Sequence, residues 1–308
     1  MQSNSVKSIE LIFEGVILTV IGCFGIIGNV AAISYFGSHK RRRQTFYGLM
    51  LVLAILDLLL IVSCFCVFSL PTFSDTYKTS RFWHYTVMWV LPFAQICFTG
   101  NTYLTVAISV ERYLTICRPF FHRARSWPTP YFIIPILSFS ILYNIPKFFE
   151  LKWSSIQSNK NETNGSSEVF HHIIPTDLRT DPVYFQVYFV WSNFIINGVI
   201  PFVLLITLNI LILKQLRTYS NRTSISRTKA KRASSKDKTE LTQPRIHQHG
   251  VDERRQAQVH MAKVSIIIVA IFIICHSIKW VPNIYEMIFV SSFVKNYSNY
   301  LLTYALLL

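Results

Sequence analysis

Long apolar runs that are almost free of charge constrain this chain most strongly. They lie at about 11–36, 45–73, 82–113, 128–149, 182–214 and 260–291. A helix needs about 20 mostly apolar residues to cross a bilayer core of about 30 Å, so each run predicts a membrane-spanning helix. A further run, 297–308, is too short to cross, and we expect it to be the first part of a seventh span. The sequence therefore predicts an all-α membrane protein, a seven-transmembrane helix bundle whose seventh helix is truncated in this chain.

Basic residues gather in alternate loops between these runs. Residues 37–46, 111–127 and 214–263 together carry +16, against +15 for the whole chain, so the remainder is close to neutral. Loops rich in Lys and Arg stay in the cytoplasm, which places the N-terminal residues 1–10 outside. We therefore predict a multi-pass protein of the plasma membrane, in contact with the lipid bilayer. Nucleic-acid binding is excluded, because no soluble domain carries the basic residues.

The two sides of the membrane have different loop chemistry. Residues 218–258 are rich in Ser, Thr, Lys, Arg and Gln and poor in large apolar residues, so they predict a flexible, basic cytoplasmic loop. The loop after the fourth run contains Asn161-Glu-Thr and Asn164-Gly-Ser. Both are acceptor sequences for N-glycosylation, which takes place on the extracellular side. We expect Asn161 and Asn164 to be glycosylated.

Among the polar residues inside the apolar runs, Asn29, Asp57 and Asn101 stand out. Polar groups at membrane depth are costly and usually mark a function or an internal partner. The three side chains are expected to converge on the bundle interior, as a polar cluster that holds a cation. Hydrogen bonding between helices without an ion is the alternative.

The third run ends in Glu111-Arg112-Tyr113. Adjacent residues project about 100° apart on a helix, so Arg112 could pair locally with Glu111, reach a neighbouring helix or extend to lipid headgroups. Prolines lie inside two later runs, at Pro201 and Pro282. Proline removes a backbone donor and clashes with the preceding turn, which predicts kinks there.

Taken together, these landmarks resemble the rhodopsin-like G-protein-coupled receptors, over nearly the whole chain. The motifs that carry the resemblance are Gly28-Asn29-Val30, Leu53-Ala54-x-x-Asp57, Glu111-Arg112-Tyr113, Pro201 and Trp280-Val-Pro282. Within that family the chain is most similar to the FMRFamide-type neuropeptide receptors of invertebrates. The strings for this subgroup include Thr105-Val-Ala-Ile-Ser-Val-Glu-Arg-Tyr and Cys275-His-Ser-Ile-Lys-Trp-Val-Pro.

The resemblance implies a receptor that is not an enzyme. Its partners would be a peptide ligand and a heterotrimeric G protein, coupled by an outward movement of the sixth helix. Arg112, flanked by Glu111 and Tyr113, would lock the inactive state and contact the G protein, and Trp280 would be the switch below the ligand. Asp57 and Asn101 fall where the family holds an allosteric sodium ion, and no other cofactor is implied.

The sequence also departs from the family pattern. Val87 stands where most members place a cysteine of an extracellular disulfide, and residues 152–181 contain no cysteine, so that disulfide is expected to be absent. The end of the seventh span is also missing from this sequence. We expect the sequence to be a piece of a longer receptor, a true truncation being the alternative.

Candidate ligand-binding residues lie toward the outer helix ends. They are Glu286, Glu150, Glu14, Trp191, Tyr285 and Gln95. A peptide ending in Arg-Phe-amide offers a guanidinium, which a carboxylate pairs bidentately, and a ring, which stacks on aromatic side chains. The alternatives are internal pairs of Glu286 with Lys279 and of Glu150 with Lys147, and an interfacial role for the aromatic residues.

Three other functions are alternatives to a neuropeptide receptor. A chemosensory receptor of the same fold is the nearest rival. A transporter would usually show repeated halves and helices broken at matching positions, neither of which is seen. A membrane enzyme is disfavoured because the chain has no His-Glu-x-x-His and no Gly-x-Ser-x-Gly.

Overall fold

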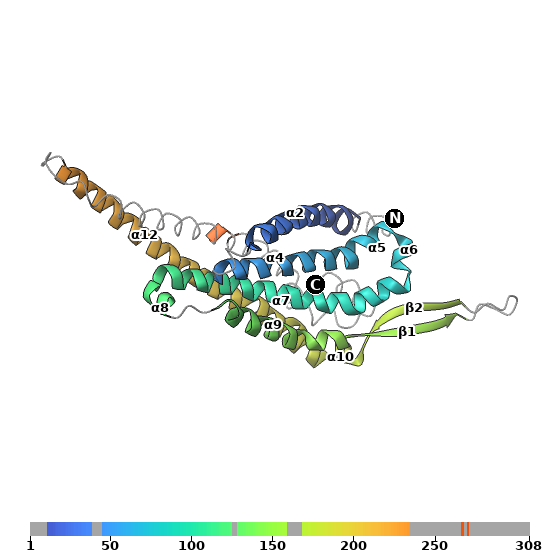
Figure 1. Ribbon diagram of the computed structural model, residues 1–308. Coiled ribbons are helices and arrows are strands. Elements are labelled where there is room, and N and C mark those ends of the chain that lie inside the picture. Colours follow the sequence, from blue (N-terminus) through green and yellow to red (C-terminus); the bar gives the residue numbers. More distant parts are fainter. Residues whose placement is uncertain are drawn as a thin grey trace.

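The computed structural model describes residues 11–38, 45–124, 128–158, 168–234, 266, 267 and 270. Within these ranges the chain forms long helices that lie side by side, and a two-stranded hairpin extends from one end of the bundle (Figure 1). The α-helices are α2 (Leu18–Phe36), α4 (Thr45–Cys64), α5 (Leu70–Phe73), α6 (Asp75–Lys78), α7 (Arg81–Cys117), α8 (Pro119–Ala124), α9 (Pro130–Asn144), α10 (Asp177–Thr180), α11 (Pro182–Tyr184) and α12 (Ile200–Ser234). The π-helical segments are Leu11–Ile17, Phe65–Ser69, Phe185–Ser192 and Phe194–Val199, and Ile145–Phe149 is a 3₁₀ turn.

Four helical segments of the described chain are long and apolar enough to cross a membrane. They are Leu11–Phe36, Thr45–Phe73, Pro130–Phe149 and Pro182–Thr218. Their large apolar side chains are widely exposed, as in Phe24, which is 73% exposed. A contiguous apolar surface of this extent on a helical bundle fits contact with lipid.

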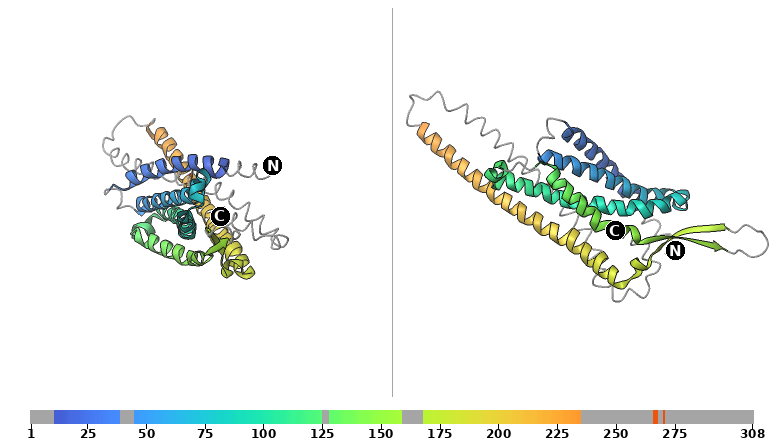
Figure 2. Two further views of the ribbon diagram at one scale, coloured as in Figure 1. Left: turned by 90° about the vertical axis from the view of Figure 1, so that its right-hand side faces the viewer. Right: turned by 60° about the horizontal axis from the view of Figure 1, so that its bottom comes forward.

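The third predicted span differs from the other four. Helix α7 has 37 residues, but it falls below the mean hydropathy of the other segments because polar side chains such as Thr99, Thr102 and Ser109 interrupt it. These three side chains are fully buried. Helix α7 packs against α4, α9 and α12 (Figure 2). It is therefore the central helix of the described bundle, and its polar groups face protein.

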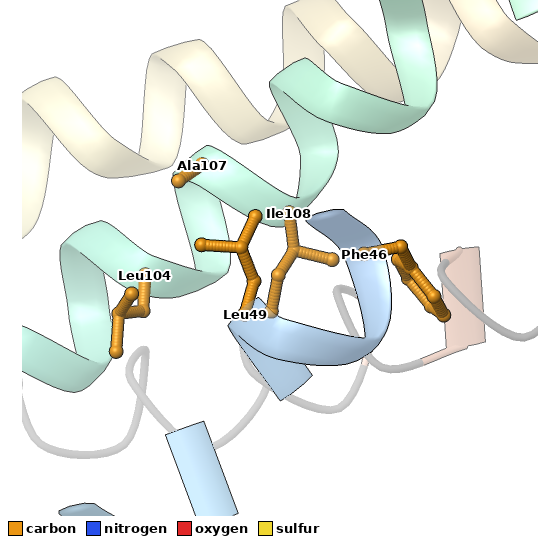
Figure 3. Packing of buried hydrophobic residues seen from close by; sticks show 5 residues of the cluster. All are labelled: Phe46, Leu49, Leu104, Ala107 and Ile108. Atoms are coloured by element: carbon orange, nitrogen blue, oxygen red, sulfur yellow. The ribbon is translucent and has the colours of Figure 1, made fainter. Parts of the chain in front are cut away.

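The core near the α8 end of the bundle lies between α4 and α7. Figure 3 shows Phe46 and Leu49 of α4 against Leu104, Ala107 and Ile108 of α7. One turn before Leu104 on α7, Gly100 lies where α4, α7 and α9 meet. A Cβ at Gly100 would lie 2.9 Å from Leu56 Cδ1 of α4 and within 4 Å of side chains of α9. Small residues at such crossings let membrane helices approach closely, which strengthens their packing.

Prolines shape the helices in a repeated way. The π-helical segments Phe65–Ser69 and Phe194–Val199 each end two residues before a proline, Pro71 and Pro201. Because proline has no N–H, it frees the carbonyl four or five residues earlier, and the helix widens locally. In both places a tyrosine hydroxyl donates to the carbonyl five residues before the proline. Tyr77 donates to Cys66 O at 3.2 Å, and Tyr103 donates to Ile196 O at 2.8 Å.

A third proline has the same arrangement with a tighter turn. Pro146 lies in the 3₁₀ turn Ile145–Phe149, where hydrogen bonds join residues three apart. The carbonyl three residues earlier belongs to Tyr143, and it accepts a hydrogen bond from the Tyr188 hydroxyl at 2.5 Å. These tyrosines link neighbouring helices at the positions where proline weakens the helix itself.

Two features differ from the sequence predictions. The sequence predicts a fifth span to about 214 whose helix extends a turn or two into the flexible loop 218–258, whereas α12 continues as a helix to Ser234. The strong helix formers Lys, Arg and Ala in residues 214–234 support this extension. Strands β1 (Leu151–Ser158) and β2 (Glu168–Pro175) form an antiparallel hairpin in register Leu151↔Pro175, in a segment where we expected only a loop. The hairpin and the far end of α12 point away from opposite ends of the bundle (Figure 1).

Candidate functional site

A small cavity lies at the hairpin end of the bundle. Its lining comes from α7, the end of the fourth span, β1, α10 and the fifth span: Leu91, Pro92, Gln95, Lys147, Glu150, Leu151, Arg179, Phe189 and Asn193. Its volume of about 30 Å³ gives room for about two water-sized groups. Two of the predicted ligand-binding residues, Gln95 and Glu150, are thus brought to one place.

The Glu150 carboxylate is at the centre of a buried ionic network. Its Oε1 lies 3.1 Å from Lys147 Nζ and accepts a hydrogen bond from the Tyr184 hydroxyl at 2.8 Å. Its Oε2 lies 3.0 Å from Arg179 Nη1. The side chains of Arg179, Glu150 and Lys147 are only 3%, 9% and 12% exposed. The pairing of Glu150 with Lys147, which the sequence left open as an alternative to ligand binding, is therefore present.

Aromatic rings complete the surroundings of the two cations. The Phe189 ring centroid lies 4.0 Å from Lys147 Nζ and 3.6 Å from the Arg179 guanidinium carbon. Tyr188 offers a second ring to Lys147 at 5.5 Å. Cations over ring faces are attracted by the ring quadrupole, and more strongly where water is excluded. These contacts fix Lys147 and Arg179 between the fourth and fifth spans.

The same end of the bundle holds the hairpin in place. Thr176 N donates to Glu150 O at 2.9 Å, so the chain after β2 is joined to the end of the fourth span. The Trp153 ring of β1 stacks on Tyr85 of α7 with centroids 5.2 Å apart. Ile173 of β2 packs in one hydrophobic cluster with Val87, the residue at the family's cysteine position. Packing and hydrogen bonds thus attach the hairpin to α7 and to the fourth span.

The polar residues of the spans are only partly brought together. Asn101 Nδ2 donates to Asp57 Oδ1 at 2.8 Å and links α7 to α4. Asn101 Oδ1 is buried and has no hydrogen-bond partner in the described ranges. Asn29 instead donates to Gly25 O of its own helix at 3.0 Å. Asp57 and Asn101 are therefore joined, with the Asn101 side-chain oxygen beside them, whereas Asn29 has a local bond within its own helix.

At the opposite end of α7, Arg112 pairs locally. Its Nε lies 3.2 Å from Glu111 Oε2, an ionic contact without the alignment of a hydrogen bond. The guanidinium carbon lies 3.3 Å from the centroid of the Phe46 ring, and the Arg112 side chain is 4% exposed. Tyr113 packs with Ile116 and with Ile212 of α12. Of the interactions that the sequence allowed for Arg112, the local one with Glu111 is observed.

The remaining predicted residues lie in several places. Glu14 is half-buried in the first span, where its carbonyl accepts a hydrogen bond from Ser69 Oγ at 2.9 Å. Trp191 is 42% exposed, and Pro201 is fully buried in α12. The other candidates lie outside the described residues: Asn161, Asn164, Trp280, Pro282, Tyr285 and Glu286.

Sequence reasoning missed Arg179, the main partner of Glu150. Arg179 lies in a polar segment, Asp177-Leu-Arg-Thr-Asp181, which reads as an ordinary solvated loop. No signal in the sequence marks it, and the need for a second cation becomes visible only in the structure, where the Glu150 carboxylate is deeply buried. A buried carboxylate needs compensation on both oxygens.

Comparisons with known proteins identify the family. The family model for the 7 transmembrane receptor (rhodopsin family) matches residues 28–308. The FMRFamide receptor of Drosophila melanogaster is 30% identical over 220 residues, which is 68% of this chain and 38% of that receptor. The FMRFamide peptide receptor frpr-18 of Caenorhabditis elegans is 26% identical over 46% of this chain and 34% of that receptor. The probable G-protein coupled receptor frpr-1 of the same nematode is 24% identical over 71% of this chain and 62% of its own length.

The chain thus spans between about a third and three fifths of the length of these relatives. The matched family consists of receptors and not enzymes. The match covers all the helices from the middle of α2 onward, including both ends of α7 and the cavity. This chain belongs to the rhodopsin family of seven-transmembrane receptors.

Proposed function

We propose that this protein is a cell-surface receptor for an amidated, FMRFamide-like neuropeptide, and that it signals through a heterotrimeric G protein. The observation that carries the proposal is that charged groups gather at the two opposite ends of the bundle. A buried, charged cavity lies at the hairpin end, and the Glu111–Arg112 pair lies at the other. The names of two relatives, both FMRFamide receptors, support the peptide class.

Activation would act on Arg112. In the described state its charge is neutralised by Glu111 and its guanidinium covers the Phe46 ring, so it offers little surface to a partner. Outward movement of the sixth helix, with Trp280 and Pro282 as its switch and kink, would open this end of the bundle. Arg112 would then leave Glu111 and contact the G protein, while Tyr113 and Pro201 adjust the packing against α12.

The ligand's arginine is assigned to Glu286, with Tyr285 and Trp191 available to its aromatic ring. Glu150 is a weaker candidate for this role, because Lys147, Arg179 and Tyr184 already occupy its carboxylate oxygens. Gln95, beside Glu150 in the cavity, offers an amide to the peptide backbone, and Glu14 offers a second carboxylate on the first span.

A sodium ion would fit beside Asp57. Hard cations prefer oxygen ligands, and the described residues offer the Asp57 carboxylate and the buried Asn101 Oδ1. When bound, the ion would supply a positive charge that holds α4 and α7 together. Asn29 is not required by this geometry, since its amide bonds within α2.

The test is a screen of amidated peptides, including Phe-Met-Arg-Phe-amide, on cells that express the receptor, with calcium and cyclic AMP as readouts. We expect a response to peptides that end in Arg-Phe-amide. A response to external small molecules and to none of the peptides would favour the chemosensory alternative. Substrate flux in vesicles without nucleotide exchange on a G protein would favour a transporter.

The assignment of Glu286 has its own experiment. Glu286→Gln should lower the potency of Phe-Met-Arg-Phe-amide, because the guanidinium loses its anionic partner. Glu286→Arg, combined with a peptide in which Arg is changed to Glu, should restore part of the response. Unchanged potency in Glu286→Gln would remove Glu286 from the binding site.

A further inference from the structure

The cavity at the hairpin end carries more positive than negative charge. Its described lining contains two cations, Lys147 and Arg179, and one carboxylate, Glu150. All three side chains are at least 88% buried, so water screens them poorly. A buried excess charge is unfavourable unless a counter-charge or strong hydrogen bonds accompany it.

The side chains of the cavity also offer more hydrogen-bond donors than unused acceptors. The acceptor oxygens of Glu150 are already used by Lys147, Tyr184 and Arg179. Asn193 Oδ1 is also used, because it accepts a hydrogen bond from Asn197 Nδ2 at 2.8 Å. Donors are left over. An ammonium has three N–H groups, and the polar partner of Lys147 within the described chain is Glu150.

We propose that this cavity binds the carboxylate of an acidic residue in the peptide ligand. The excess cationic charge of Lys147 and Arg179 would attract it, and the remaining donors of Lys147 and the Asn193 amide would bond its oxygens. The volume of about 30 Å³ suits the two oxygens of one carboxylate. This inference rests on the proposed function, and it adds that the neuropeptide carries an Asp or Glu besides its Arg-Phe-amide end.

A ligand guanidinium is the wrong group for the same place. It would meet Lys147 and Arg179 within a few ångströms, and like charges juxtaposed at a buried interface are strongly unfavourable. The two ends of such a peptide would therefore bind in separate subsites, the acidic residue here and the arginine elsewhere. This separation gives the receptor a means to distinguish peptides that share the same Arg-Phe-amide end.

The first experiment compares matched peptides on cells that express the full receptor. The probes are Phe-Met-Arg-Phe-amide extended at its N-terminus by Asp or by Asn, directly or through one, two or three glycines. With one spacer length, the Asp probe should bind about tenfold more tightly than the Asn probe, as expected for a charge-assisted hydrogen bond. Equal binding of the Asp and Asn probes at every spacer length would overturn the proposal.

Three variants locate the effect. Lys147→Gln should abolish the preference for Asp, and Asn193→Asp should abolish it too, because it places a carboxylate in the cavity. Lys152→Gln is the control, since Lys152 is 47% exposed and pairs with the exposed Asp177 outside the cavity. If Lys147→Gln fails to fold, Asn193→Asp still decides, because it adds a counter-charge. A preference for Asp that persists in Asn193→Asp contradicts the assignment.

A second measurement is independent of the peptide class. Acetate, compared with acetamide at equal ionic strength, should raise the unfolding temperature of the purified receptor. The rise should persist in Lys152→Gln and be absent in Asn193→Asp. If Phe-Met-Arg-Phe-amide does not bind at all, the proposed function fails, and this measurement alone decides about the carboxylate. An equal effect of acetate on the receptor and on Asn193→Asp would overturn the proposal.

Discussion

The Arg112 side chain is buried in this structure, although we expect it to contact the G protein on activation. Its guanidinium is covered by the Phe46 ring at 3.3 Å and paired with Glu111 at 3.2 Å, so little of its charge reaches solvent. Both contacts are local to the α8 end of the bundle. The ionic contact is not aligned as a hydrogen bond, but it is buried, so Arg112 would leave Glu111 only if another partner took over its charge.

Arg112→Ala should abolish G-protein coupling while the receptor remains at the cell surface. The substitution removes the charge that we expect to contact the G protein, and the folded bundle keeps its Leu49–Leu104–Ile108 core. Ligand-dependent nucleotide exchange and surface staining measure the two properties separately. Normal exchange by Arg112→Ala would remove this residue from the mechanism.

Glu150→Gln tests the buried ionic network. The variant leaves Lys147 and Arg179 without their shared carboxylate, and the loss of one partner of a buried pair costs about 3 kcal/mol or more. We expect a clearly lower unfolding temperature for the purified receptor.

The matched control is Asp177→Asn, because the Asp177–Lys152 pair lies in solvent, where such pairs contribute little. If Glu150→Gln unfolds at the same temperature as Asp177→Asn, the network does not stabilise the fold.

At the scale of helices, tyrosine hydroxyls and prolines act together. Tyr77, Tyr103 and Tyr188 each donate to a carbonyl three to five residues before a proline. Each hydroxyl belongs to a different element from the proline. The carbonyl that lacks its usual helical donor therefore forms a hydrogen bond to a neighbouring element. Proline kinks in membrane helices are tolerated where neighbouring side chains satisfy the freed backbone groups.

Tyr103→Phe should therefore destabilise the contact between α7 and the fifth span. The part-buried Ile196 carbonyl would lose its donor inside an apolar span, at a cost of about 1–3 kcal/mol. Thermal unfolding of the purified receptor measures the loss. Tyr85→Phe is the control, since Tyr85 is 55% exposed on α7 and its ring stack on Trp153 does not need the hydroxyl. An equal effect of the two substitutions would show that the Tyr103 hydroxyl has no special role.

The helices were easier to predict from sequence than their contacts. A run of apolar residues such as 45–73 implies a span whatever its neighbours are, because the bilayer sets the length. The partners of Glu150 could not be found this way, since Arg179 comes from a loop 29 residues away and only the packed structure brings them together. The hairpin Leu151–Pro175 was missed because its strands mix polar and apolar residues without the regular alternation that marks a buried face.

The end of helix α12 could not be predicted for a different reason. Charged residues end a membrane span but do not end a helix, so the change in composition at Lys214 gives no sign of where α12 itself ends. Helix α7 has a lower mean hydropathy than the other spans because it contains more polar residues. It can contain them because it lies at the centre of the bundle, where they contact protein and not lipid. Its length and its flanking basic residues still indicated a span.

The whole molecule is expected to have its hairpin end outside the cell. An epitope tag at the N-terminus should be stained on intact cells, whereas a tag inserted between 240 and 250 should be stained only after the membrane is permeabilised. Asn161→Gln combined with Asn164→Gln should remove the mass shift that a glycosidase produces. Staining of the 240–250 tag on intact cells would reverse the predicted orientation.

The length of α12 has a consequence for how movement could cross the membrane. From Pro201 to Ser234 the helix runs for about 50 Å at 1.5 Å per residue, well beyond a core of about 30 Å. If the widened turn before Pro201 bends by only 5°, the far end of a rigid helix of that length is displaced by about 4 Å. A change smaller than one side chain at the turn before Pro201 would thus become a displacement as large as a residue at the far end of α12.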